Sequence, residues 1–247
     1  LNGTPNMGFR DLVIQKRESD LVAASFGRGF YVLDDYSPLR NFSNDNLKKK
    51  GHLFPIKDGK WFIQRSNLGN TGADFYLAEN PKYGVTMTYH LGNNYETKSE
   101  KRKKSEKRLN QNLLDVPFPG YNNLDDEKNE TPAYIKISIE DQEGNIIRHL
   151  KERAARGTHR ITWDLRHMFK GAVTDSNKKY NLRGPIVKPG KYSASLYLVE
   201  NGETTKLSEK KIFELKPIYE SILKGTSFKD YNNYVDDYFR VYTDMHI

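Results

Sequence analysis

The chain has 247 residues, with 40 basic and 32 acidic side chains, a formal net charge of +8 at pH 7 and no cysteine. The absence of cysteine excludes disulfides, zinc–thiolate sites, iron–sulfur clusters and thiol nucleophiles. Aromatic residues make up 12% of the chain, which is too many for a wholly disordered protein, and the length suits one large or two small domains. No apolar run reaches the about 18 residues that cross a membrane, and residues 1–10 lack the apolar core of a signal peptide.

The first 40 residues predict an antiparallel meander of three strands, at residues 11–15, 20–26 and 29–35. A polar turn at residues 16–19 separates the first two strands, and Gly27-Arg28-Gly29 separates the second from the third. Nearly every residue within the strands is apolar, which is typical of a sheet buried on both faces. Three such strands leave apolar faces uncovered, so we expect them to need neighbours, as a partial domain would.

Residues 41–72 are predicted to be an irregular connection docked on the rest of the molecule. Polar and glycine-rich stretches fill most of it, and Trp61-Phe62-Ile63 is the expected anchor onto a core.

Residues 73–216 predict a β-sandwich of about seven strands, interrupted by an insert at residues 93–131. Alternation is clearest around Ile137 and Trp163, where every second residue is apolar. Asn201-Gly202 predicts a hairpin into one long final strand. The expected strands are residues 74–78, 84–91, 133–140, 145–150, 158–166, the stretch containing Tyr192, Ala194, Leu196 and Leu198, and residues 204–215.

The insert contains the densest charge of the chain. Residues 98–108 hold seven basic and two acidic side chains, and the acids of residues 115–130 follow them. No aromatic residue interleaves with the basic run, so the pattern favours an exposed helix with ion pairs. A nucleic-acid or anionic-surface patch is the alternative.

Residues 217–247 predict a C-terminal amphipathic helix. Ser227 with Asp230 resembles a capping box with a shorter acid, and tyrosines recur at helical spacing from Tyr231 to Tyr242. The pattern runs to Ile247 without a stop signal, so we interpret the chain as a fragment that is truncated in this helix.

No constellation of residues predicts chemistry, so we assign no catalytic, cofactor-binding or metal-binding residue. No serine lies in a Gly-x-Ser-x-Gly turn, and Gly27-Arg28-Gly29 precedes a strand rather than a helix. No pair of histidines has metal-ligand spacing on a predicted helix. The six histidines are His52, His90, His149, His159, His167 and His246.

Three pairs of adjacent acids, Asp34-Asp35, Asp125-Asp126 and Asp236-Asp237, invite comparison with glycoside hydrolases, which place two carboxylates across a sugar. Neighbouring side chains on a strand face opposite ways, so Asp34 and Asp35 are expected to serve a strand end or a turn.

Trp163 is expected in the core, because Ile161 and Leu165 lie on the same face of its strand. The alternative is an exposed platform on which a sugar stacks. Trp61 is less constrained.

Two stretches resemble a known group of proteins. Residues 11–40, DLVIQKRESDLVAASFGRGFYVLDDYSPLR, resemble the last blade of large bacterial propeller proteins with BNR-type, sortilin-like (VPS10-like) repeats, which are often labelled glycosyl hydrolases. Residues 78–192 are similar to the domain that follows that propeller, both in the sequence of their motifs and in the order in which the motifs occur. They also resemble the immunoglobulin-like domain of flagellar hook-capping proteins, through D-x-x-G-x-x-x-R-x-L, W-D-L-R and P-G-x-Y.

The resemblance implies a C-terminal segment of a secreted or periplasmic protein, composed of a partial blade, a sandwich, a charged helical insert and a tail helix. Its expected role is structural: the sandwich braces the propeller, contacts it within the same chain and presents a surface to a glycan or protein ligand. We expect no nucleic-acid partner, no cofactor and no membrane span. The Asp-box pattern Ser-x-Asp-x-Gly-x-x-Trp does not occur here, so no catalytic residue carries over.

Two alternatives stay open. In the first, the whole protein hydrolyses glycosides and loops such as residues 170–184 border its active site. In the second, the sandwich itself is a glycan- or protein-binding module.

Overall fold

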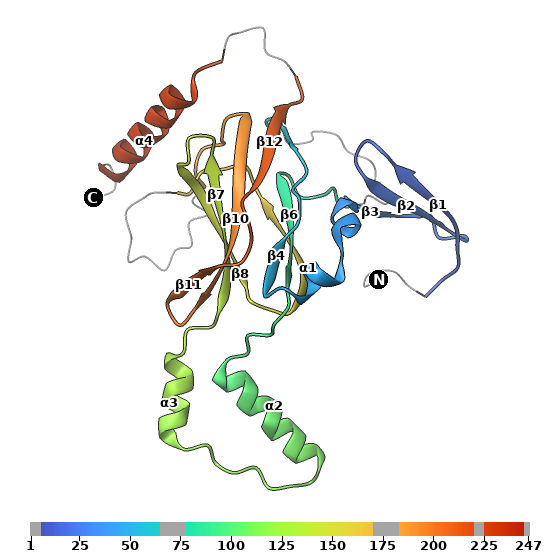
Figure 1. The fold of residues 1–247 in the computed structure, drawn as a ribbon, viewed down its shortest axis with the longest axis vertical. Coiled ribbons are helices and arrows are strands. Elements are labelled where there is room, and N and C mark those ends of the chain that lie inside the picture. Colours follow the sequence, from blue (N-terminus) through green and yellow to red (C-terminus); the bar gives the residue numbers. More distant parts are fainter. Residues whose placement is uncertain (1–5, 65–77, 170–182, 220–224, 245–247) are drawn as a thin grey trace, which may run out of the picture.

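The computed structural model describes residues 6–64, 78–169, 183–219 and 225–244, and it shows a mainly β chain (Figure 1). A central sandwich carries a small separate sheet on one side, a projecting pair of helices at one end and a helix near the other end. The predicted fold class is therefore confirmed, and no helix among these residues is long and apolar enough to cross a membrane.

The sandwich consists of two sheets. The larger has the strand order β5-β12-β10-β7-β8, with β11 paired to β10, and the smaller has the order β4-β6-β9. All pairs are antiparallel except β12 with β5. The bounds are β4 Gly51–Leu53, β5 Gly59–Trp61, β6 Val85–Leu91, β7 Tyr134–Asp141, β8 Ile146–Arg153, β9 Gly157–Trp163, β10 Gly190–Glu200, β11 Glu203–Lys206 and β12 Lys211–Pro217.

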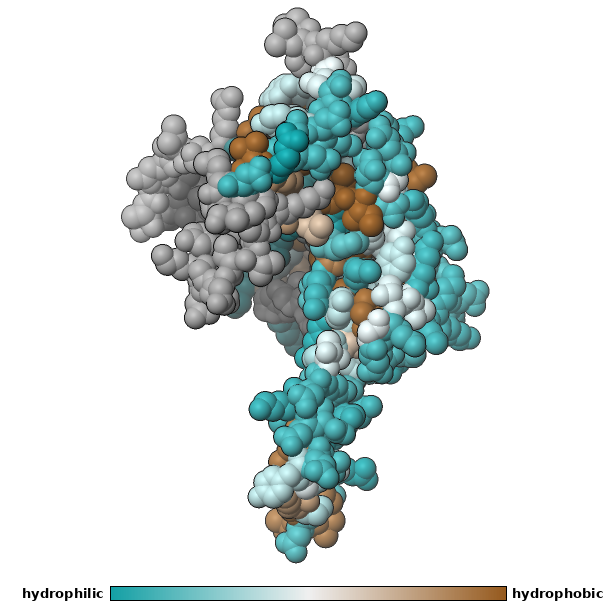
Figure 2. Space-filling view, turned by 90° about the vertical axis from the view of Figure 1, so that its left-hand side faces the viewer, coloured by the Kyte–Doolittle hydropathy of each residue, from teal (hydrophilic) through white to brown (hydrophobic). Residues whose placement is uncertain are grey.

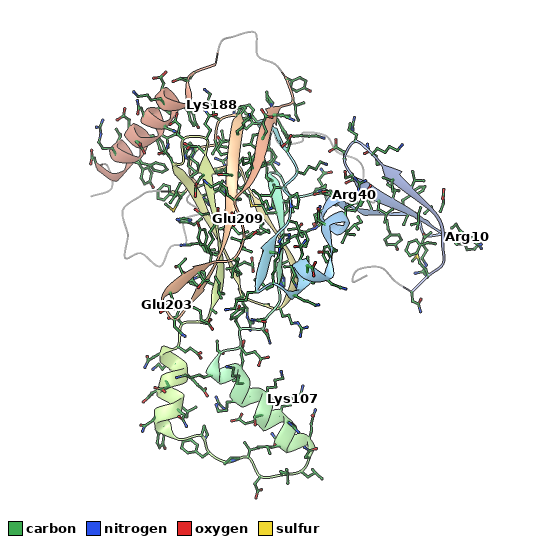
Figure 3. The ribbon with its side chains drawn as sticks, viewed as in Figure 1. Arg10, Arg40, Lys107, Lys188, Glu203 and Glu209 are labelled. Atoms are coloured by element: carbon green, nitrogen blue, oxygen red, sulfur yellow. The ribbon has the colours of Figure 1, made fainter. Side chains whose placement is uncertain are left out.

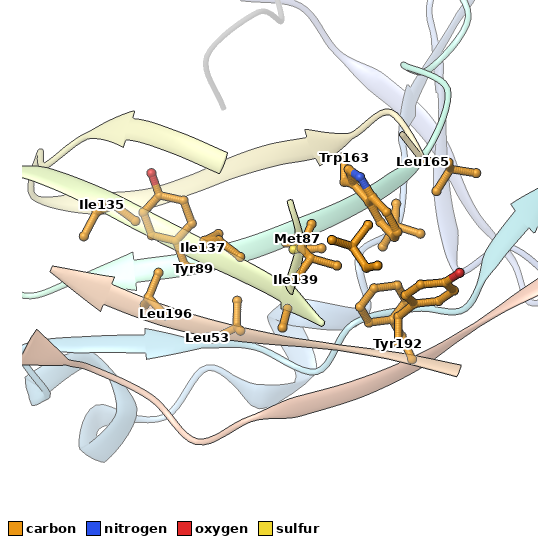
Figure 4. Packing of buried hydrophobic residues seen from close by; sticks show 14 of the residues in the cluster. Leu53, Met87, Tyr89, Ile135, Ile137, Ile139, Trp163, Leu165, Tyr192 and Leu196 are labelled. Atoms are coloured by element: carbon orange, nitrogen blue, oxygen red, sulfur yellow. The ribbon is translucent and has the colours of Figure 1, made fainter. Parts of the chain in front are cut away.

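The core lies between these two sheets (Figure 4). Ile135, Ile137 and Ile139 of β7 are fully buried, as the alternation predicts. Trp163 is also fully buried, and its ring packs edge-on against Tyr192 with 5.4 Å between centroids. Its Nε1 donates to the carbonyl of Arg166 at 3.0 Å, which satisfies the polar atom of a buried indole. The prediction that Trp163 belongs to the core is confirmed.

The prediction of an irregular connection at residues 41–72 is wrong for its middle part. After η1 (Ser37–Asn41) and α1 (Asn44–Lys48), β4 joins the smaller sheet and β5 joins the larger one. Strands of three residues are too short to show an alternating pattern. Each also begins with glycine, and a Cβ on Gly59 would lie 2.4 Å from Cγ2 of Val85, so this glycine serves close packing rather than disorder.

The long final strand predicted at residues 204–215 is two strands. β11 pairs with the end of β10 and β12 pairs with its beginning, on the same edge. Between them Leu207 packs against the core, and its amide donates to the carbonyl of Leu196 at 2.9 Å. The predicted Asn201-Gly202 hairpin is confirmed, with φ of 51° and 82° at the two turn residues. Of the strand predicted at residues 74–78, residues 74–77 lie outside the described residues.

The small sheet consists of β1 (Phe9–Gln15), β2 (Asp20–Ser25) and β3 (Phe30–Leu33) in that order. The predicted meander is confirmed, but in this chain the sheet is not buried on both faces. Leu12 is 61% exposed and Phe30 is 75% exposed, because the sandwich covers neither face of this sheet.

The insert folds into two helices, α2 (Lys98–Gln111), which the charge pattern of residues 98–108 predicts, and α3 (Tyr121–Asn129), which that pattern did not indicate. Thr97 and Glu100 form a capping box at the start of α2. Arg102 donates to both carboxylate oxygens of Glu127 across the pair, at 2.7 and 2.9 Å. Neither helix buries a residue, so ion pairs rather than a core join them.

The tail helix is α4 (Phe228–Asp244). Ser227 Oγ accepts from the amide of Asp230 at 3.1 Å and donates to its carboxylate at 2.6 Å, which confirms the predicted cap. Val235 and Phe239 are buried, and the Tyr231 hydroxyl donates to the carbonyl of Ile186. The predicted continuation to Ile247 lies outside the described residues.

Candidate functional site

The small sheet meets the sandwich at a cleft of about 630 Å³, which we call the junction. The turn between β1 and β2 and the end of β3 form one wall. The segment around β5 and the residues that lead into β6 form the other. The charged residues that line it are Glu18, Asp20, Asp34, Asp35, Lys57, Asp58, Lys60 and Lys82.

Glu18 is the centre of the charge network in the junction. Its carboxylate accepts from Lys57 Nζ at 2.9 Å and from Lys60 Nζ at 2.6 Å, and Lys57 also donates to its backbone carbonyl. The hydrogen bonds from Lys60 and then Lys57 lower the pKa of Glu18 to about 2. The turn of the small sheet is therefore attached to the sandwich by a charge-assisted contact.

Arg160 makes the second attachment. From β9 its guanidinium donates to the carbonyl of Asp34 at 2.7 Å and to that of Asp35 at 2.6 Å. The planar fork of arginine fits two successive carbonyls, so one side chain fixes both the position and the direction of the chain after β3.

Asp34 and Asp35 occupy a turn, as predicted. Asp35 has φ of 43°, and its Oδ1 accepts from the Ser37 amide at 3.2 Å and from the Ser37 hydroxyl at 2.6 Å. The amide of Asp35 donates to Asp20 Oδ1 at 2.9 Å, which joins this turn to the start of β2. The carboxylates of Asp20 and Asp35 therefore shape the chain at this turn.

The remaining acid pairs are on helices. Asp126 pairs with Lys98 at 3.3 Å between α2 and α3, and Asp237 pairs with Arg240 at 3.0 Å on α4.

Tyr83 and Phe62 close one side of the junction. The Tyr83 hydroxyl donates to the carbonyl of Phe62, and the two rings pack edge-on with centroids 4.8 Å apart. Burial raises the pKa of Tyr83, so this phenol stays protonated and works as a hydrogen-bond donor at neutral pH. Within the described parts of the chain, no group of three histidines or acids is placed to hold a metal ion.

The described histidines lie on β4, β6, β8 and β9 and after β9, and His52 and His90 are cross-strand partners. His159 Nε2 lies 2.8 Å from the carbonyl of Ala155, and His90 Nδ1 lies 3.1 Å from Thr158 Oγ1. His52 packs edge-on against Phe54, and burial lowers the pKa of His52 and of His149. His167 is buried, and His246 lies outside the described residues.

Neither tryptophan forms a platform for a sugar. Trp163 is fully buried. Trp61 is half-buried against the core, and its Nε1 donates to the carbonyl of Val187 at 2.6 Å. The predicted anchoring of this segment on the core is confirmed for Trp61, whereas Ile63 is 69% exposed.

Sequence reasoning did not identify the residues that make the junction. Glu18 bonds to lysines 39 and 42 positions away, and Arg160 bonds to carbonyls more than 100 positions away. Glu18, its two lysine partners and Arg160 each lie in a stretch whose sequence is typical of an exposed polar surface. No local pattern could have singled them out, because the partners meet only when β5 and β9 have been placed in the sandwich.

Comparison with known proteins adds little to this geometry. No family model matches the chain, and no curated protein matches it. One solved structure that it is similar to is the crystal structure of CopC from Methylosinus trichosporium OB3b, with a TM-score of 0.25 and 13% identity over 59% of this chain and 85% of that chain. A likeness at this level carries no argument about the function of this chain.

Proposed function

We propose that this chain is the C-terminal part of a larger secreted propeller protein, in which the sheet β1–β3 belongs to the last blade. In this proposal the sandwich is a non-catalytic accessory domain that braces the blade. The observation that carries the proposal is the junction, which holds the small sheet by its polar turns and leaves its apolar side chains uncovered.

The uncovered side chains give the first support. Leu12, Val13 and Ile14 of β1 and Phe30 and Val32 of β3 are between 49% and 75% exposed. Contiguous apolar surface of this kind marks an interaction site in a soluble protein. A propeller blade has the same requirement, because it buries its faces against the blades on either side.

The attachments give the second support. Among the described residues, the hydrogen bonds and ion pairs that Arg160 and the two lysines bound to Glu18 make with the small sheet go to the β1–β2 turn and the segment after β3. A brace must fix a blade at one end without occupying the faces that its neighbours need. These contacts satisfy that condition, since they lie at the turns.

The residues of the resemblance give the third support. The W-D-L-R segment contributes Trp163 and Leu165 to the core, and P-G-x-Y contributes Tyr192. The motifs shared with the domain that follows such propellers are therefore the ones that build this sandwich.

The direct test is the structure of the complete gene product. We expect β1–β3 to pack against a further blade, with Leu12 and Phe30 buried and the junction unchanged. Leu12 and Phe30 left in solvent, or a preceding sequence without strand repeats of about 40 to 50 residues, would overturn the proposal.

Removal of residues 41–247 from the complete protein separates a brace from a part of an active site. If the sandwich is a brace, the shortened protein loses thermal stability while its specific activity on a polysaccharide panel is unchanged. Loss of activity with an intact propeller would favour the glycoside hydrolase alternative. Residues 170–182, part of the loop expected to border that active site, lie outside the described residues.

The binding-module alternative has a separate test. Affinity electrophoresis of the whole 247-residue chain in gels that contain polysaccharides should show no retardation if the chain only braces. Retardation by one polymer would favour the binding-module alternative instead.

A further inference from the structure

The two-helix insert ends in an apolar tip, which we define as residues 113–121. Leu113 is 95% exposed, Leu114 is 56%, Phe118 is 64% and Tyr121 is 77%. Figure 2 shows hydrophobic atoms at the far end of the insert, beyond a mostly hydrophilic shaft. Exposed aliphatic and aromatic side chains gathered at the end of a projecting element require an explanation.

The insert presents this tip away from the sandwich (Figure 1). At its base, the amide of Lys98 donates to Glu130 at 2.6 Å, and one helical turn further along α2 the bidentate pair of Arg102 with Glu127 joins the two helices. Within the tip, the rings of Phe118 and Tyr121 pack edge-on with centroids 5.1 Å apart. The shaft is therefore an ordered spacer, and the apolar residues are held together at its end.

The charges of the shaft are divided between two faces. Arg102 binds Glu106 and Glu127, and Lys98 binds Asp126, on the side of α2 that meets α3. Helical spacing places Lys103, Lys104 and Lys107 on the other side, with Lys101 and Arg108 on one flank. Figure 3 shows Lys107 on the side of α2 away from α3.

The acids of the insert cancel only part of this basic face, at Lys104. Glu100 is paired with Arg153, and Glu96 lies 3.2 Å from Lys104. Three acids of the insert stand apart from the ion pairs: Asp125 lies on α3, Asp115 lies in the tip itself, and Glu130 accepts from the backbone amide of Lys98. Among described residues, Lys101, Lys107 and Arg108 make no ion pair within 4 Å. Apolar tip and basic face thus adjoin at the end of α2.

We propose that the tip docks on an anionic lipid surface. The apolar side chains enter the boundary between headgroups and acyl chains, and the basic residues of the last turns of α2 face the headgroups. With a rise of 1.5 Å per residue, Arg108 lies about 5 Å and Lys104 about 11 Å from the end of α2 at Gln111. Elements bound at an interface insert by about 5 to 10 Å, so these charges lie at headgroup depth.

The size of the tip favours a lipid surface over a protein. A stable protein interface buries at least about 1,000 Å² over both partners with good shape complementarity, whereas the exposed apolar part of this tip consists of five side chains. A bilayer requires only a small apolar element with cations beside it. This inference stands on the insert and is independent of the proposed function.

The first test is flotation of the whole chain with vesicles. We expect binding to vesicles of phosphatidylethanolamine with 30% phosphatidylglycerol and weak binding to pure phosphatidylcholine. The triple variant Leu113→Ser, Phe118→Ser, Tyr121→Ser should lower the partition coefficient by about tenfold or more. A matched control changes three isoleucines elsewhere that are between 52% and 71% exposed, Ile63, Ile146 and Ile212, to Ser and should bind as the wild type does.

The second test distinguishes binding through the basic face from general adsorption of a chain whose net charge is +8. Each lysine or arginine near an anionic surface contributes about fivefold to binding. Lys104→Gln, Lys107→Gln and Arg108→Gln together should therefore weaken binding by at least about tenfold, with a steep dependence on salt. The control variant, with exposed Lys16, Lys206 and Lys229 changed to Gln, should lose far less.

The third test reports insertion directly. The indole that Phe118→Trp introduces should shift its emission to shorter wavelength on vesicles and be quenched by lipids brominated on the acyl chain. Equal binding by the tip variant and its control, or emission from the introduced indole that stays unquenched, overturns the proposal. Failure of the wild type to bind any vesicle also overturns it and assigns the tip to a protein partner or a second copy. Unchanged thermal unfolding of each variant confirms that the fold is retained.

Discussion

The small sheet and the sandwich contain strands of similar apolar content, but the apolar side chains are exposed in the small sheet and buried in the sandwich. β1 contains Leu12, Val13 and Ile14 in succession, all at least 49% exposed, whereas Ile135, Ile137 and Ile139 of β7 are fully buried. The difference lies in the presence of an opposing layer. β7 faces the sheet β4-β6-β9 across a shared core, whereas β1 faces no second sheet among the described residues of this chain. Apolar residues favour strand formation in both regions, but a strand adds to stability through burial only where a second layer covers it.

The two regions also differ in how they are held. The sandwich is joined by a continuous apolar core, and the small sheet is joined to it by hydrogen bonds and ion pairs at the junction. Apolar burial withstands changes of salt and pH, whereas exposed ion pairs do not. The small sheet should therefore open at conditions in which the sandwich stays folded.

A pair of glycine substitutions should separate the two regions most strongly. Gly84→Ala would place a Cβ 1.8 Å from the carbonyl oxygen of Trp163, at a φ of 128°. We expect it to cost about 4 kcal/mol or more of unfolding free energy, measured by urea denaturation. Gly27→Ala in the small sheet has φ of 74° but nothing within 4 Å, so it should cost only about 1 kcal/mol. Similar losses from the two would contradict the comparison.

A pair of isoleucine truncations tests burial itself. Ile137→Ala in β7 removes a fully buried side chain, and we expect a loss of about 2 to 5 kcal/mol. Ile14→Ala in β1 removes a side chain that is 49% exposed, and the loss should be below about 1 kcal/mol. Denaturation followed by circular dichroism measures both. An Ile14→Ala loss as large as that of Ile137→Ala would mean that the small sheet is buried in solution.

Removal of Arg160 should loosen the small sheet without unfolding the sandwich. Arg160→Ala deletes two charge-assisted hydrogen bonds, worth about 1 to 2 kcal/mol, so proteolysis within residues 1–40 should become about tenfold faster. Arg156→Ala, in the turn before β9 and exposed, is the control and should leave the rate unchanged. In the wild type we expect the first cuts within residues 1–40 or 93–131. Early cleavage elsewhere that spared residues 1–40 would count against a loosely held sheet.

The smallest effect is the response of the junction to acid. The pKa of Glu18 falls from 4.5 to about 2 on folding, so its contribution is fully present above pH 4.5 and is lost as the pH falls through about 2. Pepsin cleavage within residues 1–40 should accelerate in that window relative to cleavage of the insert. The Glu18→Gln variant should be cut rapidly within residues 1–40 at every pH, and its cleavage rate should not rise further as the pH falls. If this variant had the same dependence of cleavage rate on pH as the wild type, the acid response would belong to another carboxylate. Asp58 is one such carboxylate, because its pKa is also lowered.

The sequence alone determined the elements whose pattern is local. Alternation in residues 133–140 and 158–166, the Asn201-Gly202 turn, the charge pattern of the insert and the cap at Ser227 each depend on neighbours within a few positions. These elements form as predicted because backbone geometry and side-chain direction impose their periods. The same reasoning placed Trp163 in the core.

Only the tertiary structure decided which short or polar segments complete the sandwich and hold the small sheet. β4 and β5 have three residues each and become strands because β6 and β12 present them with unpaired edges. Leu207 ends β11 because it turns into the core beside Gly51. Glu18, Lys57 and Arg160 meet their partners across large separations in the chain, and such contacts are fixed by packing, which no window of a few residues contains.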